Sequence, residues 1–163
     1  MKLIAEKQGR ADKLDVLRCV RGNGTQTSTP MPRQGILPHD LIHYVVESTL
    51  GYRFGFLGMV AGGADIAFAM QQSHEAQAQG LADEAVHAEA IVESLQAQLW
   101  SGGFDEAAFH EGVRAACAAR STGAPDLHAV DIEQQLLGGV IALNARWQQV
   151  PFHASLELDM PHI

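Results

Sequence analysis

The sequence predicts an α+β fold, namely one mostly helical domain over residues 1–163 with a small antiparallel sheet. Two short apolar-rich segments near the N-terminus, residues 1–7 and 13–21, flank a turn and are typical of a β-hairpin. Near the C-terminus, residues 151–161 alternate between apolar and polar side chains, which indicates a half-buried strand. Long stretches with helical periodicity fill the chain between them. We therefore expect the N-terminal hairpin and the C-terminal strand to pair in one sheet.

The ends of the expected helices are marked by capping residues and glycines. The first helix begins near Pro38, a residue suited to the first helical position, and ends at Gly51. Asp105 and Asp126 are placed to cap two later helices. In chain order, the expected helices span about 38–50, 64–79, 82–100, 105–123 and 127–149. The segment 22–35, rich in Gly, Thr, Ser and Pro, is predicted to be a loop or linker after the hairpin.

Charge is distributed unevenly along the chain. Residues 1–33 hold seven Lys or Arg against three Asp or Glu, whereas residues 34–163 hold four against sixteen. Nucleic-acid binding needs a broad basic surface, so the acidic body of the chain argues against DNA or RNA as a partner. We expect the basic N-terminal segment to pack beside the acidic body, or beside a second copy of the chain in a homo-oligomer.

The cysteines and the apolar segments indicate a cytoplasmic protein with no membrane partner. Cys19 and Cys117 are too few and too far apart to form a disulfide framework. The N-terminal residues lack the apolar core of a signal peptide. The most apolar stretch, residues 54–70, is interrupted by Asp65 and is predicted to be buried protein core instead of a membrane span.

The segment ILPHDLIHYVVE, residues 36–47, contains the strongest candidate for a site. At about 100° per residue, His39 and His43 lie about 40° apart, at the border between the apolar and polar faces of the expected helix. Two imidazoles four residues apart project from adjacent turns and can bind one metal ion. Glu47 is a further candidate ligand, but it lies about 12 Å along the axis from His39. His43 could therefore pair with either neighbour, whereas binding of one ion by all three is not expected.

The residues HDLIH form the pattern H-D-x-x-H, which resembles the H-E-x-x-H helix of the zincin metalloproteases. The resemblance implies that His39 and His43 bind zinc and that Asp40 takes the place of the glutamate that activates water. Zincins need a third ligand. The segment GGADIAF, residues 62–68, resembles the G-T-x-D-x-x-Y segment that supplies an aspartate ligand in one zincin subgroup, which implies Asp65 as that ligand.

Two plainer interpretations of the same helix stay open. The helix macrodipole favours Asp40 in the first turn of any helix, so the polar residues could form an ordinary solvated face. The histidines could also act with Asp40 in metal-free acid–base chemistry. Three of the histidines outside this segment, His74, His110 and His128, have no fixed spacing to the motif and are expected on the surface, although folding could bring one of them in as a ligand.

A second motif lies further along the chain. Glu84 and His87 have the spacing E-x-x-H, which together with the D-x-x-H of the first helix resembles the ligand plan of ferritin-like di-iron proteins. That plan implies further glutamates from other helices, for which Glu111 and Glu133 are candidates.

The sequence therefore supports two functional hypotheses. In the first, the chain is a small metal-binding protein, with zinc or another divalent metal held by His39, His43 and a third ligand, either Asp65 or another histidine. The alternative metal pair is His43 with Glu47. The chain would then be a zinc-dependent hydrolase of a small molecule or peptide, with Asp40 as the base. In the second, the chain is a non-catalytic, dimeric interaction or regulatory domain without metal.

Overall fold

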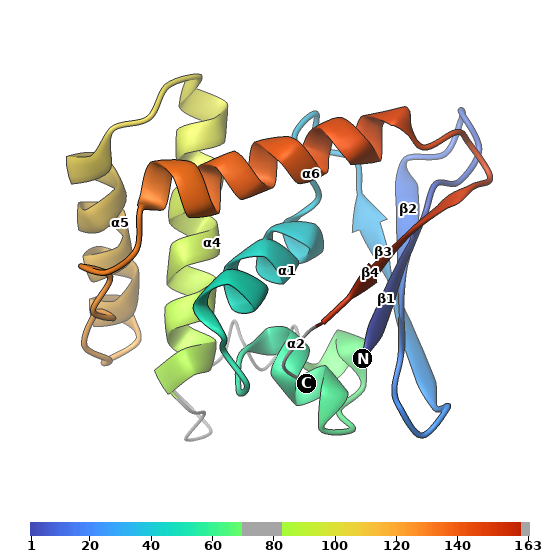
Figure 1. The fold of residues 1–163 in the computed structure, drawn as a ribbon, viewed down its shortest axis with the longest axis horizontal. Coiled ribbons are helices and arrows are strands. Elements are labelled where there is room, and N and C mark those ends of the chain that lie inside the picture. The colour runs from blue at the N-terminus through green and yellow to red at the C-terminus, as the bar shows by residue number, and fades with distance from the viewer. Residues whose placement is uncertain (70–82, 161–163) are drawn as a thin grey trace.

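The computed structural model describes residues 1–69 and 83–160 and has an α+β architecture (Figure 1). Its strands are β1 (Lys2–Glu6), β2 (Leu14–Val20), β3 (Gln26–Pro32) and β4 (Ser155–Asp159). Its helices are α1 (His39–Leu50), α2 (Phe56–Ala61), α4 (Asp83–Ser101), α5 (Glu106–Ala119), the π-helical segment η2 (Ile132–Leu137) and α6 (Gly138–Gln149). The predicted fold class is confirmed.

The strands form one antiparallel sheet in the order β3-β2-β1-β4. The C-terminal strand pairs with β1, as predicted, and Leu3 lies opposite both Cys19 of β2 and Leu158 of β4. These three side chains are buried, because every second residue of each strand points to the same face of the sheet. The last strand is shorter than the predicted 151–161, since Phe152 is exposed and His153 has a positive φ of 64°.

The prediction that 22–35 is a loop or linker is wrong for residues 26–32, which form the edge strand β3. The composition of this segment resembles a loop because it contains Pro30 and Pro32. Proline lacks a backbone N–H and is confined to edge strands, which is where both residues lie. The alternation is nevertheless that of a strand, since Thr29 and Met31 are buried and their neighbours are exposed.

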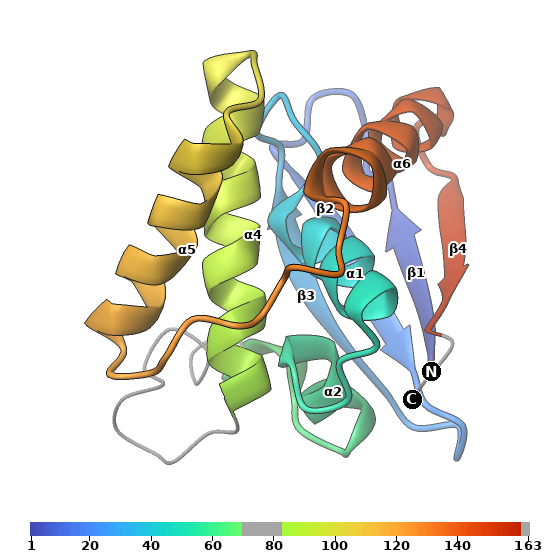
Figure 2. The same cartoon turned by 60° about the vertical axis from the view of Figure 1, so that its left-hand side comes forward.

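The helices cover one face of the sheet, as the turned view shows (Figure 2). α1 lies against the sheet and packs on α4, and α5 packs on the far side of α4. α6 crosses over α1 toward the end of the sheet where the chain turns between β1 and β2 (Figure 1). Helices α1 and α4 therefore pack against each other in the interior of the protein, and the candidate site described below lies at their interface.

The predicted helix ends are partly confirmed. α1 starts after Pro38 and ends at Gly51, whose φ of 69° is left-handed, and Asp105 caps α5 by accepting a hydrogen bond from the N–H of Ala108. Asp126 does not cap the last helix, because its carboxylate accepts from the N–H of His128 in a turn. That role belongs to Asp131, so the helical segment starts at residue 132 instead of 127. α5 also ends at residue 119, before the predicted 123.

The prediction that the apolar stretch 54–70 is protein core is confirmed in part: Phe56, Leu57, Val60 and Ile66 are buried, whereas Phe54 and Phe68 are exposed. Residues 66–69 are helical, and the remainder of the helix predicted over 64–79 lies outside the described residues. Within residues 1–69 and 83–160, no helix combines the length and the apolar character that crossing a bilayer requires.

Candidate metal centre

His39 and His43 of α1 meet Glu89 of α4 at the interface between the two helices. One potential ligand atom from each of the three residues lies within 4.8 Å of the other two. The two histidine Nε2 atoms are 3.2 Å apart, and His43 Nε2 is 3.1 Å from Glu89 Oε2. His39 Nε2 lies 3.6 Å from Glu89 Oε1. In the described part of the chain, this is the group of His, Cys, Asp and Glu side chains with the geometry to hold a metal ion.

These separations match those between ligands of one small ion. Zinc binds imidazole nitrogen and carboxylate oxygen at about 2.0–2.2 Å with tetrahedral geometry, so two of its ligand atoms are about 3.3 Å apart. The two histidine Nε2 atoms are 3.2 Å apart and His43 Nε2 is 3.1 Å from Glu89 Oε2, whereas the 3.6 Å contact of His39 Nε2 is to the other carboxylate oxygen, Oε1. Two edges of the group therefore have the length expected between ligands of one zinc ion, and one atom from each of the three residues lies within 4.8 Å of the other two.

The other ring nitrogen of each histidine has a hydrogen-bond acceptor. His39 Nδ1 lies 3.1 Å from Gln96 Oε1, and the amide of Gln96 is oriented because its Nε2 donates to Gln34 Oε1 at 3.3 Å. His43 Nδ1 lies 3.1 Å from Glu47 Oε1, and an ionised carboxylate can only accept. Both Nδ1 atoms therefore carry the proton in the neutral rings, which leaves both Nε2 lone pairs directed at each other and at Glu89.

Glu47 is fixed by the start of α2. Its carboxylate accepts hydrogen bonds from the N–H of Leu57 at 3.0 and 3.1 Å and from the N–H of Gly58 at 3.3 Å, and its side chain is fully buried. Gly55 leaves the space that this carboxylate occupies, since a Cβ at that position would lie 2.5 Å from it. An acceptor held in this way orients His43 and raises the basicity of its Nε2, as carboxylate partners do for metal-binding histidines.

In the absence of a metal, protons balance the two carboxylates that flank His43. Burial of His43 opposes protonation, but the hydrogen bonds that His43 donates to Glu47 and Glu89 outweigh it and raise the pKa of His43 to about 10. Burial of Glu89 likewise favours its neutral form, yet hydrogen bonds with His39 and His43 hold the pKa of this carboxyl far below its usual value. The metal-free cluster is therefore an imidazolium between two carboxylates at neutral pH.

The structure brings together some of the residues predicted from the sequence. His39 and His43 share one side, as the helical spacing predicts, and His43 contacts both of its expected neighbours through different nitrogens. Glu47, also named as a candidate metal ligand, is outside the three-residue group and acts on the far nitrogen of His43. This agrees with the axial separation of His39 and Glu47.

Asp40 and Asp65 have other surroundings. Asp40 is buried and close enough to Cys19 of β2 that its charge, after burial, helps to raise the pKa of that thiol to about 12. Asp65 is exposed, accepts from Thr27 Oγ1 at 2.8 Å and from the N–H of Ala67 at 3.0 Å, and lies outside the group that could hold an ion. The structure therefore does not place Asp65 as the third ligand, because its carboxylate caps a helical turn beside β3.

The residues of the E-x-x-H motif are also engaged elsewhere. Glu84 accepts from the N–H groups of Arg53 and Phe54, and His87 lies 2.8 Å from the carbonyl oxygen of Gly123. Neither belongs to the group of potential ligands. The di-iron arrangement is not formed by these residues.

Glu89 was missed by the sequence reasoning, although the sequence contains a signal for it. On the expected helix, Ala85, Val86 and Val92 lie four and three residues before Glu89 and three residues after it, so the carboxylate lies on an apolar face. All three neighbours are buried in the structure, and Glu89 itself is 1% exposed. A carboxylate on such a face needs a cation or a proton as partner.

The site is closed on one side and partly open on the other. The ring of Phe56 lies against His43 with 4.9 Å between centroids, and the His43 side chain is 2% exposed. The His39 side chain is 20% exposed. Access to the ion position is therefore on the side of His39. His74 lies outside the described residues.

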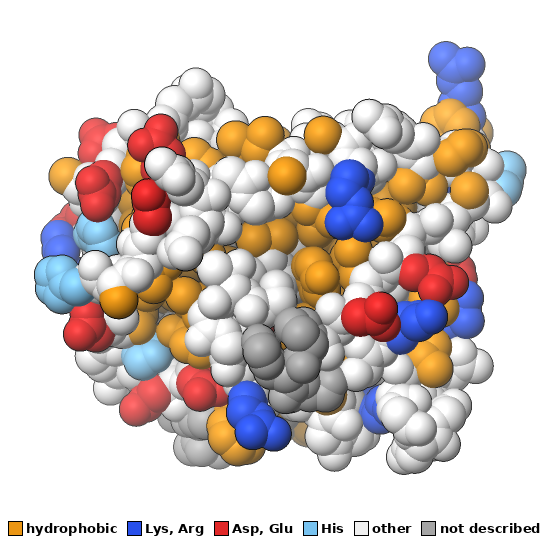
Figure 3. All heavy atoms as spheres, viewed as in Figure 1, with side chains coloured by type: hydrophobic (Ala, Val, Ile, Leu, Met, Phe, Trp, Pro, Cys, Tyr) orange, Lys and Arg blue, Asp and Glu red, His pale blue; other side chains and the backbone are white. Residues whose placement is uncertain are grey.

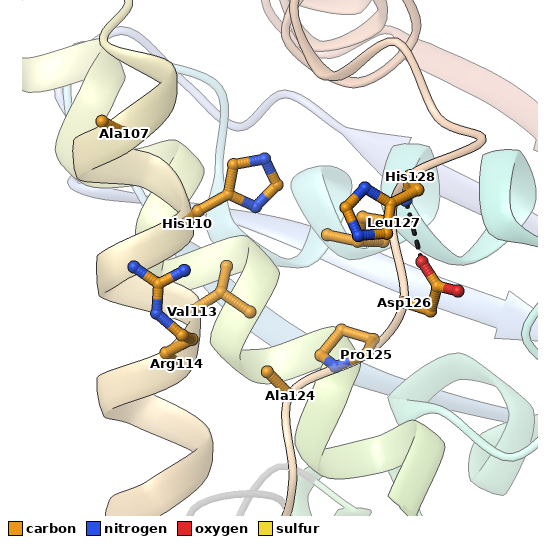
Figure 4. Close-up of a pocket in the computed structure, with 9 residues that line it drawn as sticks. All are labelled: Ala107, His110, Val113, Arg114, Ala124, Pro125, Asp126, Leu127 and His128. Carbon is orange, nitrogen blue, oxygen red and sulfur yellow. Dashed lines mark hydrogen bonds between the residues drawn. The ribbon is translucent and has the colours of Figure 1, made fainter.

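A second pair of histidines borders a pocket of about 450 Å³ between α5 and residues 124–128 (Figure 4). His110 and His128 face this pocket from its two walls, above an apolar base that includes Val113 and Leu127. Acidic and histidine side chains gather on this part of the surface (Figure 3). The pocket and the α1–α4 cluster share no residue, so this pocket is separate from the candidate metal centre.

The fold and the site define an α+β protein with a buried group of two histidines and one glutamate. Comparisons of this chain with protein-family models, curated proteins and solved structures gave no match.

Proposed function

We propose that the protein binds one zinc ion through His39 Nε2, His43 Nε2 and a carboxylate oxygen of Glu89. The observation that carries the proposal is the convergence of His39 Nε2, His43 Nε2 and the Glu89 carboxylate, with contacts of 3.1–3.6 Å that involve both carboxylate oxygens, while both Nδ1 atoms have acceptors of their own. Lone pairs that converge in this way need a metal ion or a proton between them.

The donor set suits zinc, and two histidines with one carboxylate are also the facial triad that binds Fe²⁺ in non-haem iron proteins. Two imidazoles and one carboxylate suit the borderline-soft, tetrahedral Zn²⁺, whereas Mg²⁺ and Ca²⁺ prefer six or more oxygen ligands. The Irving–Williams order also places zinc above Mn²⁺ and Fe²⁺ for a nitrogen-containing site. Cu²⁺ binds such sites still more tightly, which makes it the competitor to include in any titration.

Three protein ligands leave the fourth position of a tetrahedral ion for water, which is the pattern of catalytic zinc sites. Bound zinc lowers the pKa of such a water to about 7 and so supplies hydroxide at neutral pH. This is the chemistry of a zinc-dependent hydrolase. A small molecule or peptide would reach the ion from the side of His39, whose side chain is 20% exposed. Asp40 is buried and lies outside the three-residue group, so the proposal does not assign it the role of base.

The second candidate is a non-catalytic, dimeric interaction or regulatory domain without metal. The observation that favours it is the protonation of His43 between Glu47 and Glu89, since the raised pKa of about 10 allows a proton to balance the buried carboxylates without any ion. In that case the cluster joins α1 to α4 and has no chemical role.

Protein purified without a His-tag and stripped with a chelator distinguishes the two candidates. We expect zinc to bind with one-to-one stoichiometry by isothermal titration calorimetry, and to release about one proton at pH 7 because the ion replaces the proton on His43. Titration in two buffers of different ionisation enthalpy measures that proton. Elemental analysis of protein that was never stripped measures the native metal.

A matched pair of variants assigns the binding to the cluster. Glu89→Gln should abolish tight zinc binding, whereas His110→Gln should leave it unchanged, since His110 lies on the exposed pocket of α5. Zinc binding that is lost equally in both variants would refute its assignment to the cluster. Zinc binding absent from the wild type, with no metal found by elemental analysis, would favour the metal-free candidate instead.

A further inference from the structure

A second pocket, of about 240 Å³, lies where the basic N-terminal segment meets the end of α6. It is bordered by Lys7 and Arg33 from the N-terminal segment, by Trp147 and Phe152 from the C-terminal part, and by Pro38 at the start of α1. Figure 1 shows this end of α6 crossing the end of the sheet near the β1–β2 turn. The pocket shares no residue with the His39–His43–Glu89 group.

Asp15, the acidic residue that borders this pocket, already has hydrogen-bond donors at both carboxylate oxygens. Arg33 donates to both carboxylate oxygens of Asp15 at 2.6–3.0 Å, and the N–H of Gln8 donates to Asp15 Oδ1 at 2.9 Å. Arg33 also donates through Nη2 to the carbonyl oxygens of Gln8 and Gly9. Asp15 is 1% exposed, so its negative charge is balanced by Arg33 and is not accessible to a ligand.

Several hydrogen-bond donors in the pocket can still donate to a ligand. Lys7 Nζ makes one hydrogen bond, to the carbonyl oxygen of Gln148 at 3.2 Å, although an ammonium has three N–H groups. Within the described residues, Arg33 Nη1 donates to no protein atom that the structure records, and neither does the indole N–H of Trp147. Trp147 is only 3% exposed, and a buried indole N–H usually finds a partner. Among the charged and aromatic side chains of the pocket, the groups left to a ligand are therefore donors.

Two aromatic rings form the apolar part of the same pocket. Lys7 Nζ lies 5.1 Å from the ring centroid of Trp147, and the Arg33 guanidinium lies 5.5 Å from that of Phe152. Each ring is thus paired with a cation that also borders the pocket. Phe152 is 46% exposed, a large apolar surface for a side chain that the alternating pattern of residues 151–161 would bury.

We propose that this pocket binds a small organic carboxylate with a flat apolar body. The carboxylate would accept from Lys7, Arg33 Nη1 and the Trp147 indole N–H, and its apolar body would lie against Phe152. The positive end of α1 at Pro38 adds a favourable potential for an anion. This assigns a role to the basic N-terminal segment, which otherwise only balances the acidic body, and it does not depend on a metal at the α1–α4 cluster.

Benzoate is a probe of the size and charge that this pocket would accept. The chain has two tryptophans, and Trp100 is 61% exposed, so a Trp100→Phe background leaves Trp147 as the fluorescent reporter of the pocket. In chelator-treated protein, we expect benzoate to change the Trp147 emission in a saturable way. The neutral isostere benzamide should bind at least about tenfold more weakly, because a hydrogen bond to a charged group contributes about 1.5–3 kcal/mol. Benzylamine should not bind.

Two variants and a matched control assign the site. In the same background, Lys7→Met should weaken benzoate binding about tenfold, and Phe152→Ala should weaken it as well, since this ring is half exposed and its loss leaves the core intact. Lys13→Met removes an exposed lysine of the same basic segment that does not border the pocket, and should leave binding unchanged. Thermal unfolding of each variant verifies that the fold is retained.

The proposal is overturned by any of four results. These are no saturable response to benzoate, equal binding of benzamide, equal loss in Lys7→Met and Lys13→Met, or saturation by inorganic phosphate without benzoate binding. A response that appears only after zinc is added would place the carboxylate on the metal, which refutes this pocket but supports the zinc site. Benzoate binding by protein that never binds zinc would support the pocket while the metal proposal fails.

Discussion

The α1–α4 interface and the pocket between α5 and residues 124–128 each present two histidines near an acidic side chain. At the interface, His39 and His43 direct their Nε2 atoms toward one point, 3.2 Å apart, and Glu89 completes the group. At the pocket, His110 and His128 stand on opposite walls. The acidic neighbour of His110 is Glu106, 3.8 Å away, with a side chain that is 71% exposed.

The difference lies in the outer hydrogen bonds and in burial. Gln96 and Glu47 accept from the Nδ1 atoms at the interface, so each ring has one orientation and one tautomer. Glu106 and His110 are solvated, and an exposed pair of this kind contributes little because water competes for both partners. Histidine spacing alone therefore does not distinguish the two regions; the fixed acceptors behind each ring at the interface do.

The largest expected effect is loss of zinc from Glu89→Gln. The amide keeps the shape of the side chain but removes the negative charge that the ion needs, so the zinc dissociation constant should rise by more than the roughly 10- to 100-fold typical of an outer partner. Competition with a chromophoric chelator measures it. The matched change at the other pocket, His128→Ala, should leave zinc affinity unchanged. If it lowers zinc affinity as much, the two regions do not differ as described.

Glu47→Gln should have the next largest effect. The side chain would still reach His43, but as a neutral acceptor that no longer supports the basicity of the ring, so zinc affinity should fall by about 10- to 100-fold. The counterpart at the pocket is Glu106→Gln, for which no change is expected. If Glu47→Gln removes zinc more completely than Glu89→Gln, Glu47 is itself a ligand and the ion is bound between His43 and Glu47.

The pH dependence of stability should also separate the two regions. The folded pKa of His43, about 10, is above its ordinary value of 6.5, so its protonation stabilises the metal-free fold fully below pH 6.5. This contribution is lost as the pH rises through 10. The melting temperature of stripped protein should therefore fall between pH 7 and 10, and zinc should stabilise the fold more strongly at the upper end of that range. A melting temperature that stays constant in stripped protein would show that His43 is neutral in the fold.

Local rules predicted most of the fold. The hairpin, the C-terminal strand, the caps at Pro38 and Asp105 and the glycine end at Gly51 depend on a few neighbouring residues, and each is found in the structure. The strand β3 was missed because its prolines are compatible with a sheet only at an edge, and edge position is a property of the whole sheet.

Two of the three residues of the site were predictable, again from local rules. His39 and His43 belong to one helix, so their spacing determines that they meet, whereas Glu89 is 46 residues from His43 and meets it only through packing of α1 on α4. The buried face of the α4 segment could have indicated that Glu89 needs a partner, but not which one. The interpretation of Asp65 as a ligand depended on a short resemblance, and no local rule could test that position against the rest of the fold.

The smallest expected effect is that of Asp65→Asn. Asp65 accepts from Thr27 and from the N–H of Ala67, and these hydrogen bonds hold the pKa of its carboxyl below the ordinary 3.8. Asparagine can make similar capping contacts without the charge, so we expect a small drop in melting temperature at pH 7 and no change in zinc affinity. Because a lowered carboxyl pKa stabilises the fold only above 3.8, the difference between variant and wild type should shrink as the pH falls through and below that value.

Asp65→Ala, which removes the cap altogether, should destabilise the fold further and still leave zinc bound. If either variant lost zinc in the chelator competition while Glu89→Gln retained it, Asp65 would be the third ligand, as the G-T-x-D-x-x-Y resemblance implies, and the His39–His43–Glu89 geometry would not describe the metal-bound protein.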